Sequence, residues 1–173
     1  MVAFLALPVF AGQDDPRLPD LFSRLKGTTD RNEAGALEAL IWQIWLENED
    51  DDINLLMRRG IVHMGQGQPT LALAAFDAIV QKAPNFAEGW NKRATIYFLM
   101  GDFDSSVADI ERTLALEPRH FGALSGLGQI YLALDKKAAA LRAFEGALAI
   151  DPHLSSVREV VEDLKKELGG KPT

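Results

Sequence analysis

The side chains that could do chemistry are few in this 173-residue chain, and their spacing does not favour catalysis. His63, His120 and His153 lack the spacing of metal ligands, and no Ser, His and Asp residues are grouped as in a nucleophilic triad. Cysteine is absent, which excludes disulfides and thiol catalysis. Asp102 and Asp104 fit a turn and a helix start. We therefore expect no enzyme, no metal and no cofactor.

Two groups of residues could contact a cofactor, but packing explains both better. Trp42 and Trp45 are three positions apart, so their rings share one face of a helix and could flank a ligand or form a core stripe. Gly122, Gly126 and Gly128 fall within a predicted helix instead of a phosphate-binding loop. We interpret all five as packing residues.

The elements that must position these residues recur along the chain. The steps from Pro84 to Pro118 and from Pro118 to Pro152 are both 34 residues. The same step links Leu56, Trp90 and Leu124; His63, Tyr97 and Tyr131; and Phe76, Ile110 and Phe144. A fixed period over three units predicts stacked repeats, which share a continuous core and usually offer a binding surface.

Each unit is predicted to hold two amphipathic helices joined by a turn. In the third unit one helix carries Leu124, Leu127, Ile130, Tyr131 and Leu134, and the next carries Leu141, Phe144, Ala147 and Leu148. The predicted turns are Gly65-Gln66-Gly67, Gly101-Asp102 and Asp135-Lys136. Each repeated proline ends the second helix, because the residue before a proline avoids helical geometry.

These residues resemble the tetratricopeptide repeat family over about 100 residues. The third unit matches best, with Leu124, Leu127, Gly128, Tyr131, Ala140, Phe144, Ala147 and Pro152. The second has Trp90, Ala94, Tyr97, Ser106, Ile110, Thr113 and Pro118, and the first has Leu56, Gly60, Ala72, Phe76, Ile79 and Pro84, with His63 replacing an aromatic. The resemblance implies an all-α, right-handed α-solenoid with units 53–86, 87–120 and 121–154.

The flanking segments are predicted to be helical. Residues 12–52 are predicted to hold two helices, one from about Pro19 to Lys26 and one that follows a capping box of Asp30 and Glu33. Together these helices form either a degenerate repeat, which we favour, or an N-terminal cap. Residues 155–173 hold a capping helix that begins with a box of Ser156 and Glu159. It buries Val157, Val160, Val161, Leu164 and Leu168.

The repeat positions assign roles to the charged side chains. Arg93 stands where an apolar residue is usual, and the resemblance implies an ion pair with Asp109 of the same unit, with partner binding as the alternative. Arg59 holds the same position but faces Ala75. His63 takes an aromatic core position, so we expect it to pack between helices. His120 and His153 lie at unit junctions and are expected to be exposed.

The resemblance also implies a concave groove lined by the first helix of each unit. The residues at its lining positions are Asn54, Met57, Ile61, Met64, Glu88, Asn91, Thr95, Phe98, Gly122, Ser125, Gln129 and Leu132. Met64, Phe98 and Leu132 form an apolar row, which suits a peptide or helix with apolar anchors. Some relatives grip an acidic C-terminus with Lys, Asn and Arg, but Gly122, Ile61 and Gly126 stand at those positions. An acidic-tail ligand is therefore disfavoured.

Charge and the first residues restrict the partners and the compartment. The formal net charge is −7, all of it in residues 1–52, and residues 53–173 are neutral. The acidic run 47–52 is a solvated linker or a site for a basic partner, and the absence of a basic stripe argues against nucleic acid.

Residues 1–11 are apolar and too short to span a bilayer. They end in a Val9-x-Ala11 pattern that is typical of a cleavage site, but they lack the positively charged start of an export signal. Two interpretations remain: a remnant of an export signal, which we favour, or an apolar segment that packs on the protein.

Together these features predict a non-catalytic adaptor or scaffold that binds a protein or peptide partner, exported or periplasmic in a bacterium, with a cytoplasmic site as the alternative. We expect a monomer or a weak homo-oligomer. Two other functions are a self-associating module that pairs copies through outer residues such as Leu71, and an accessory subunit of an enzyme complex.

Overall fold

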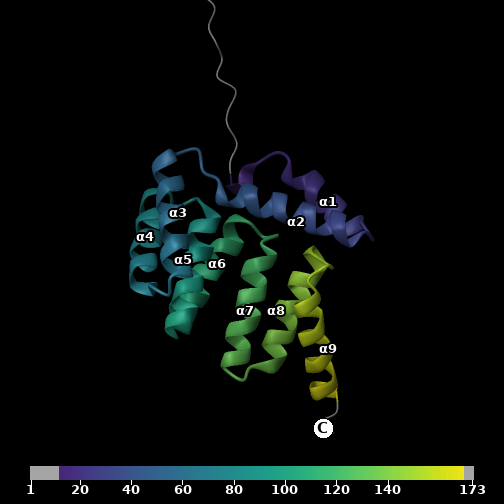
Figure 1. Ribbon diagram of the computed structural model, residues 1–173. Coiled ribbons are helices and arrows are strands. Elements are labelled where there is room, and N and C mark those ends of the chain that lie inside the picture. The colour runs from purple at the N-terminus through teal and green to yellow at the C-terminus, as the bar shows by residue number, and fades with distance from the viewer. Residues whose placement is uncertain (1–11, 170–173) are drawn as a thin grey trace, which may run out of the picture.

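The structure, a computed structural model, describes residues 12–169, and residues 1–11 and 170–173 lie outside that range. All regular structure within the described range is helical (Figure 1). A 3-10 turn η1 (Gly12–Asp14) is followed by α1 (Leu18–Gly27), α2 (Arg31–Leu46), α3 (Asp51–Gly65), α4 (Pro69–Lys82), α5 (Ala87–Met100), α6 (Phe103–Leu116), α7 (Phe121–Ala133), α8 (Lys137–Ile150) and α9 (Ser155–Gly169).

Helices α3 to α8 form three antiparallel pairs that fall within the three 34-residue units. The pairs α3/α4, α5/α6 and α7/α8 pack along their lengths, and α4 packs on α5, α6 on α7 and α8 on α9. One set of apolar residues that recur every 34 positions, Phe76, Ile110 and Phe144, is buried, and another, Leu56, Trp90 and Leu124, is half-buried. Gly128 permits this packing, because a Cβ there would come 2.5 Å from the Phe144 ring. The chain is thus an all-α solenoid, as predicted.

Turn residues and prolines set the length of each helix. Gly67, Gly101 and Asp135 have φ angles of 68°, 79° and 54°, so two of the three hairpin turns use glycine for a left-handed backbone. Each second helix ends two residues before its proline, at Lys82, Leu116 or Ile150. The described geometry therefore follows the local sequence at each hairpin turn and at each break before a proline.

The N-terminal pair α1/α2 does not continue the stack, so the interpretation as a degenerate repeat is wrong. Figure 1 shows α2 lying across the ends of the solenoid helices. Its apolar face, with Ile41 and Trp45, shares a buried cluster with Phe121 and Ala147 of the third unit. Residues far apart in the sequence make this contact, so the 34-residue period carries no information about it.

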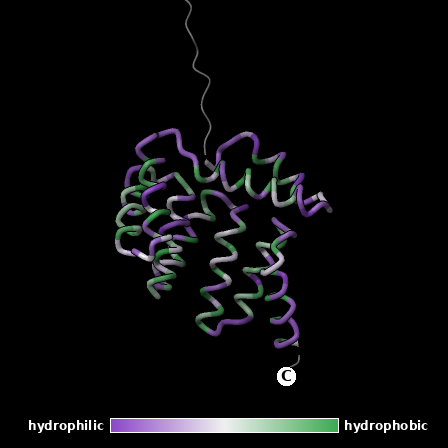
Figure 2. The backbone as a smooth tube through the Cα atoms, viewed as in Figure 1, coloured by the Kyte–Doolittle hydropathy of each residue, from purple (hydrophilic) through white to green (hydrophobic). Residues whose placement is uncertain are grey.

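The end helices are only partly as predicted. Val157, Val161 and Leu164 of α9 are buried, and hydrophilic residues predominate along the rest of that helix (Figure 2). However, α9 begins at Ser155, and the Leu154 carbonyl accepts from the Arg158 amide at 3.0 Å. Ser156 therefore lies within the first turn and, contrary to the prediction, does not cap it.

At α2, Asp30 is the N-cap and its side chain accepts from the amides of Asn32 and Glu33. The Glu33 carboxylate accepts from the Thr28 hydroxyl at 2.7 Å and from Arg24 at 3.0 Å, instead of from the Asp30 amide. The predicted capping box is therefore half formed, and its second carboxylate fastens α1 to α2.

Candidate functional site

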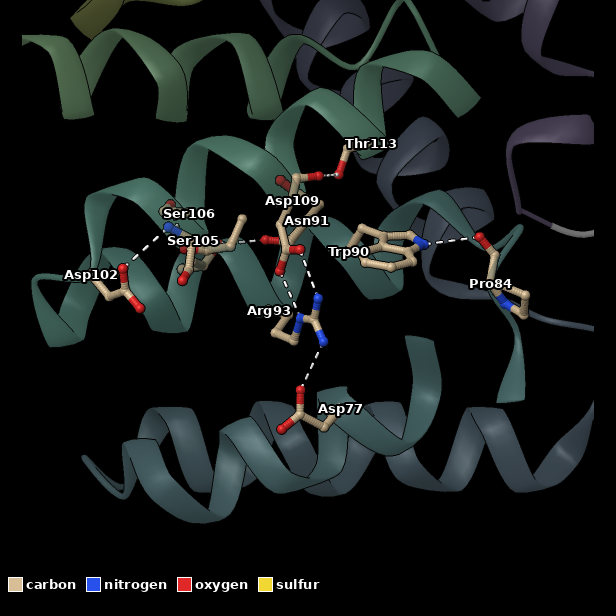
Figure 3. Close-up of polar contacts among 12 residues, drawn as sticks. Asp77, Pro84, Trp90, Asn91, Arg93, Asp102, Ser105, Ser106, Asp109 and Thr113 are labelled. Carbon is tan, nitrogen blue, oxygen red and sulfur yellow. Dashed lines mark hydrogen bonds and ion pairs between the residues drawn. The ribbon is translucent and has the colours of Figure 1, made fainter. Parts of the chain in front are cut away.

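Arg93 joins two repeat units (Figure 3). Its Nε and Nη2 atoms donate to the Asp109 carboxylate on α6 at 2.7 and 2.8 Å. Its Nη1 donates to Asp77 on α4, in the preceding unit, at 2.9 Å. Hydrogen bonds to Asp109 are the main cause that raises the pKa of Arg93. All three guanidinium nitrogens donate to carboxylates of the chain itself, which is the expected structural ion pair extended to a second acid.

The pairing with Asp109 is the one expected from the sequence, whereas Asp77 was missed. A signal for it exists: Asp77, Glu111 and Glu145 are each 34 residues apart, so every unit carries an acid at this position. An acid there faces the arginine position of the next unit. Arg93 follows Asp77 in this way, but Leu127 occupies the position that follows Glu111, so no second pair of this kind forms.

Five of the predicted groove residues, namely Asn91, Thr95, Phe98, Gly122 and Gln129, surround one hollow between α5 and α7. The hollow measures about 120 Å³, and its lining is Asn91, Ala94, Thr95, Phe98, Ser106, Ile110, Gly122, Gly126, Gln129 and Ile130. Gln129 is exposed at its edge. The Thr95 hydroxyl donates to the Asn91 carbonyl at 3.0 Å, and the Ser125 hydroxyl donates to the Phe121 carbonyl at 2.8 Å.

The first unit contributes less to the groove than predicted. Asn54 is occupied, because its side chain donates to the Asn48 carbonyl at 2.7 Å and accepts from the Asn48 amide at 2.9 Å. Met57 is buried in the core of the first unit. Predicting Met57 as a partner contact was therefore wrong, and the side chain of Asn54 is bonded within the protein. Ile61 and Met64 are half-buried against the same core, and Leu132 is half-buried against the third unit and α9.

Glu88 is the centre of a buried polar cluster. Its Oε2 accepts from His120 Nε2 at 2.8 Å and from Asn91 Nδ2 at 3.0 Å, and its Oε1 lies 2.9 Å from Lys92 Nζ. His120 Nδ1 accepts from the Ala123 amide at 3.0 Å, so the proton of a neutral imidazole is on Nε2. Burial alone raises the pKa of Glu88, but the Lys92 ammonium and the His120 hydrogen bond outweigh it and lower the pKa.

The predictions that Glu88 faces a partner and that His120 is exposed are therefore wrong. Their side chains are 1% and 0% exposed. The cause is helix α2, which covers both residues: Trp45 stacks on the His120 ring and Trp42 meets its edge. His153 is half-buried instead of exposed, and its Nε2 lies 3.0 Å from the Leu25 carbonyl.

Comparison with known proteins shows the family. The family model described as Tetratricopeptide repeat matches residues 57–101 and 92–155, which together span more than half of the chain. The chain belongs to the tetratricopeptide repeat (TPR) family. A TPR repeat-containing protein of Rhizobium etli is 37% identical over 157 residues, which are 91% of this chain and 77% of that relative.

Two solved structures share the TPR fold of this chain. One is the first TPR of Spaghetti (RPAP3) bound to the HSP90 peptide SRMEEVD, with a TM-score of 0.66 and 20% identity over 70% of this chain and 97% of that one. The other is MamA, with a TM-score of 0.64 and 17% identity over 82% of this chain and 86% of that one. At these identities the likeness shows the fold alone.

In this TPR protein the N-terminal pair closes one end of the groove. A Cβ on Gly122, at a lining position, would come 2.5 Å from Trp42 Cη2, so glycine lets the indole lie against α7. Lys92 Nζ lies 5.3 Å from the centre of the Trp42 ring. The groove that stays open is the half nearer the hairpin turns, around Thr95, Phe98 and Gln129.

The closure is a stable part of the TPR chain. The buried cluster takes eight large apolar side chains from the pair, namely Leu18, Leu21, Phe22, Leu25, Leu37, Ile41, Ile44 and Trp45. Burying one such side chain contributes about 1.5–3 kcal/mol. The pair is therefore fastened to Phe121 and Ala147 of the third unit by a shared apolar core.

Two further properties hold for residues 12–169. None of the helices there is both long and apolar enough to cross a bilayer. No three or more His, Asp or Glu side chains of this range gather as they would around a metal ion.

Proposed function

We propose that this protein is a non-catalytic adaptor or scaffold that binds a peptide or a helix of a partner protein in the open half of its groove. The hollow between α5 and α7 carries the proposal. Its apolar walls are Phe98, Ile110 and Ile130, and polar groups of Asn91 and Gln129 lie beside them. A groove with an apolar anchor point and a few polar groups suits this mode of recognition.

The size of the hollow indicates one anchor side chain. An engineered apolar cavity of about 150 Å³ binds benzene, and this hollow measures about 120 Å³. A single Leu, Met or Phe side chain of the partner is of that order. The side chain of Gln129 makes no hydrogen bond within the described residues. Its side-chain amide is therefore available to pair with the partner's backbone next to the anchor.

The chemistry around the hollow favours an apolar anchor over an acidic tail. One structural neighbour, the first TPR of Spaghetti, is bound to an HSP90 peptide, which supports peptide binding for the shared architecture. This chain has Ile61, Gly122 and Gly126 at the positions of the carboxylate clamp. Its nearby Lys92 is already paired with Glu88, so we propose a different ligand for this groove.

Filling the hollow tests the proposal without unfolding the protein. A Cβ on Gly126 would have its nearest neighbour, Ile110 Cδ1, at 3.7 Å, so Gly126→Leu places a side chain in the hollow. Replacing a helical glycine also favours folding, by up to about 1 kcal/mol. A crosslinking pull-down from the native cell supplies the partner, and calorimetry measures its affinity.

We expect Gly126→Leu to weaken binding at least about tenfold, or 1.4 kcal/mol. Gly146→Leu is the matched control, because Gly146 is a helical glycine on α8, outside the hollow, where a Cβ would also have its nearest neighbour, Leu124, at 3.7 Å. Undiminished partner binding by a folded Gly126→Leu protein would refute the proposed site.

A second candidate function is self-association. Met64, Pro69, Ile96 and Leu99 line an apolar hollow of about 270 Å³ at the end of the first unit, and Leu99 is 60% exposed. Leu71, the outer residue expected to pair copies, is 52% exposed on α4. Light scattering across a concentration series would show a dimer that Leu99→Glu or Leu71→Glu abolishes. A monomer at every concentration would exclude this function.

A further inference from the structure

A second cavity, outside the groove, lies between the N-terminal pair and the connection from α8 to α9. It measures about 600 Å³. One wall comes from the end of α1 and the first turns of α2, with Lys26 and Arg31, and the opposite wall comes from His153 and Arg158. The volume is in the range of small-ligand sites, about 300–1,000 Å³.

Positive charge is concentrated in this cavity, although the protein carries a net charge of −7. Lys26, Arg31 and Arg158 all line it, and none of them forms an ion pair within residues 12–169. Within the described residues, the Arg158 guanidinium donates only to the Pro152 carbonyl. Unpaired cations that converge from separate segments on one cavity favour an anion.

Glu38 is the one acidic residue of the lining. Burial of its carboxyl is the main cause that raises the pKa of Glu38, the nearby Asp151 raises it further, and His153 lowers it. The net effect disfavours the ionised carboxylate and so weakens its repulsion of a bound anion. The lining therefore holds three cationic side chains and one carboxyl group, that of Glu38, whose ionised form is disfavoured.

The rest of the lining indicates a polar ligand. Thr29 and Ser155 offer hydroxyl groups, and the apolar contribution comes from small residues such as Ala34 and Pro152. No aromatic ring other than His153 lines the cavity, so a nucleobase or a lipid chain lacks a surface to pack on. Helix α9 begins at this cavity, which adds to its positive potential, whereas the Asp30 carboxylate already caps the start of α2.

We propose that this cavity binds a phosphate group, either as the free ion or as the ester of a small polyhydroxy compound. Arg31 and Arg158 hold the phosphate oxygens from opposite walls and Lys26 adds a third charge. Thr29, Ser155 and Glu38 lie where hydroxyl groups of an ester bind. Because the cationic walls belong to the N-terminal pair and to α9, the ligand fastens these two segments together.

Calorimetry on the full chain tests this in about 150 mM NaCl, which screens loose surface attraction. The probes are inorganic phosphate, glucose 6-phosphate and glucose. We expect saturable binding of at least one phosphate probe and none of glucose. Tighter binding of glucose 6-phosphate identifies an ester as the ligand, and tighter binding of inorganic phosphate identifies the free ion. The absence of saturable binding for both phosphate probes would overturn the proposal.

Matched charge variants locate the site. Arg31→Gln combined with Arg158→Gln should weaken phosphate binding at least about tenfold. Arg58→Gln combined with Arg59→Gln removes the same charge from exposed positions on α3 and should leave the affinity unchanged. Equal losses in both double variants would show nonspecific charge attraction and contradict the site. Circular dichroism confirms that each variant is folded, and the saturating probe should raise the melting temperature of the wild type more than that of the Arg31/Arg158 variant.

Discussion

Trp45 stacks on His120, with ring centres 4.1 Å apart and ring planes inclined by only 11°. The first residue belongs to α2 and the second caps the start of α7. His120 in turn lies 2.8 Å from the Glu88 carboxylate on α5. One aromatic contact therefore joins the N-terminal pair to the second and third repeat units and buries an ionised glutamate beneath it.

The buried glutamate should make stability depend on pH. The pKa of Glu88 is lowered in the fold, so its contribution is present above the unfolded-state pKa, about 4.3, and is lost as the pH falls through the folded-state value. We expect Glu88→Gln to lower the unfolding free energy by about 1.5–3 kcal/mol at neutral pH. Urea melts should show this deficit shrinking below pH about 4. A constant deficit across the pH range would contradict the assignment, and exposed Glu111→Gln is the control.

Two glycines on α7, four residues apart, should respond to alanine with opposite signs. At Gly122 a Cβ would come 2.5 Å from Trp42, whereas at Gly126 the nearest atom would be 3.7 Å away. Gly126→Ala should stabilise by about 0.5–1 kcal/mol through helix propensity. Gly122→Ala should destabilise by about 1–3 kcal/mol, because Trp42 must move. Denaturant melts of the two variants decide this, and equal shifts would mean that α2 does not lie on α7 in solution.

The two acids that pair with Arg93 should differ in importance. The Asp109 side chain is 6% exposed and that of Asp77 is 36% exposed. We expect Arg93→Ala and Asp109→Ala each to cost about 3–5 kcal/mol and their combination to cost less than the sum, because the second change removes a stranded charge. Asp77→Ala should cost about 1 kcal/mol or less. The measurement is a double-mutant cycle by denaturant melts, and strict additivity of Arg93 and Asp109 would contradict the pairing.

The open half of the groove should carry the binding energy. Phe98→Ala with Asn91→Ala is expected to weaken binding of the partner by about 2 kcal/mol or more, the range of interface hot spots. Asn91 also donates to Glu88, so the melting temperature of this variant must be measured alongside its affinity. The outer-face control, Glu111→Ala with Arg112→Ala, should change affinity by less than about tenfold. If only the outer-face pair abolishes binding, the convex surface is the site.

The fold should not need residues 1–11, which lie outside the described range. Its first anchors are Gly12, where a Cβ would come 3.3 Å from the Phe86 ring, and Gln13, which donates to the Asn85 carbonyl at 2.7 Å. We propose that the protein is exported and cut after Ala11. N-terminal sequencing of the native protein should then begin at Gly12, and a chain starting there should keep its unfolding free energy within about 0.5 kcal/mol. An intact Met1 in a soluble cytoplasmic fraction would contradict the export proposal.

Most of the fold could be predicted because its determinants are local or periodic. The 34-residue step indicates the stacked hairpins, and Gly101 and Pro118 lie at a turn and a helix end that neighbouring residues determine. Arg93 and Asp109 could be paired because both belong to one unit. The Asp77 contact needed one more step, a comparison of the acid position across successive units.

The covered end of the groove could not be predicted, because it depends on contacts without a period. Trp42 meets Gly122, and Trp45 meets His120, across more than seventy residues of sequence. The repeat positions of Glu88 and His120 predict that both side chains are accessible, as they would be in a solenoid without α2. Only the placement of α2 shows that they are buried and that one end of the groove is covered.

The contact between α2 and the third unit also changes how the chain should unfold. In an open repeat array each unit touches only its neighbours, so stability follows a one-dimensional, nearest-neighbour description and the ends fray first. Here Phe121 and Ala147 are held by residues from the opposite end of the sequence. The N-terminal pair and the third unit therefore cannot separate without disturbing each other, and the long sequence separation raises contact order, which slows folding. The solenoid should therefore lose its structure in a single transition, as a closed ring does, instead of unzipping from its ends.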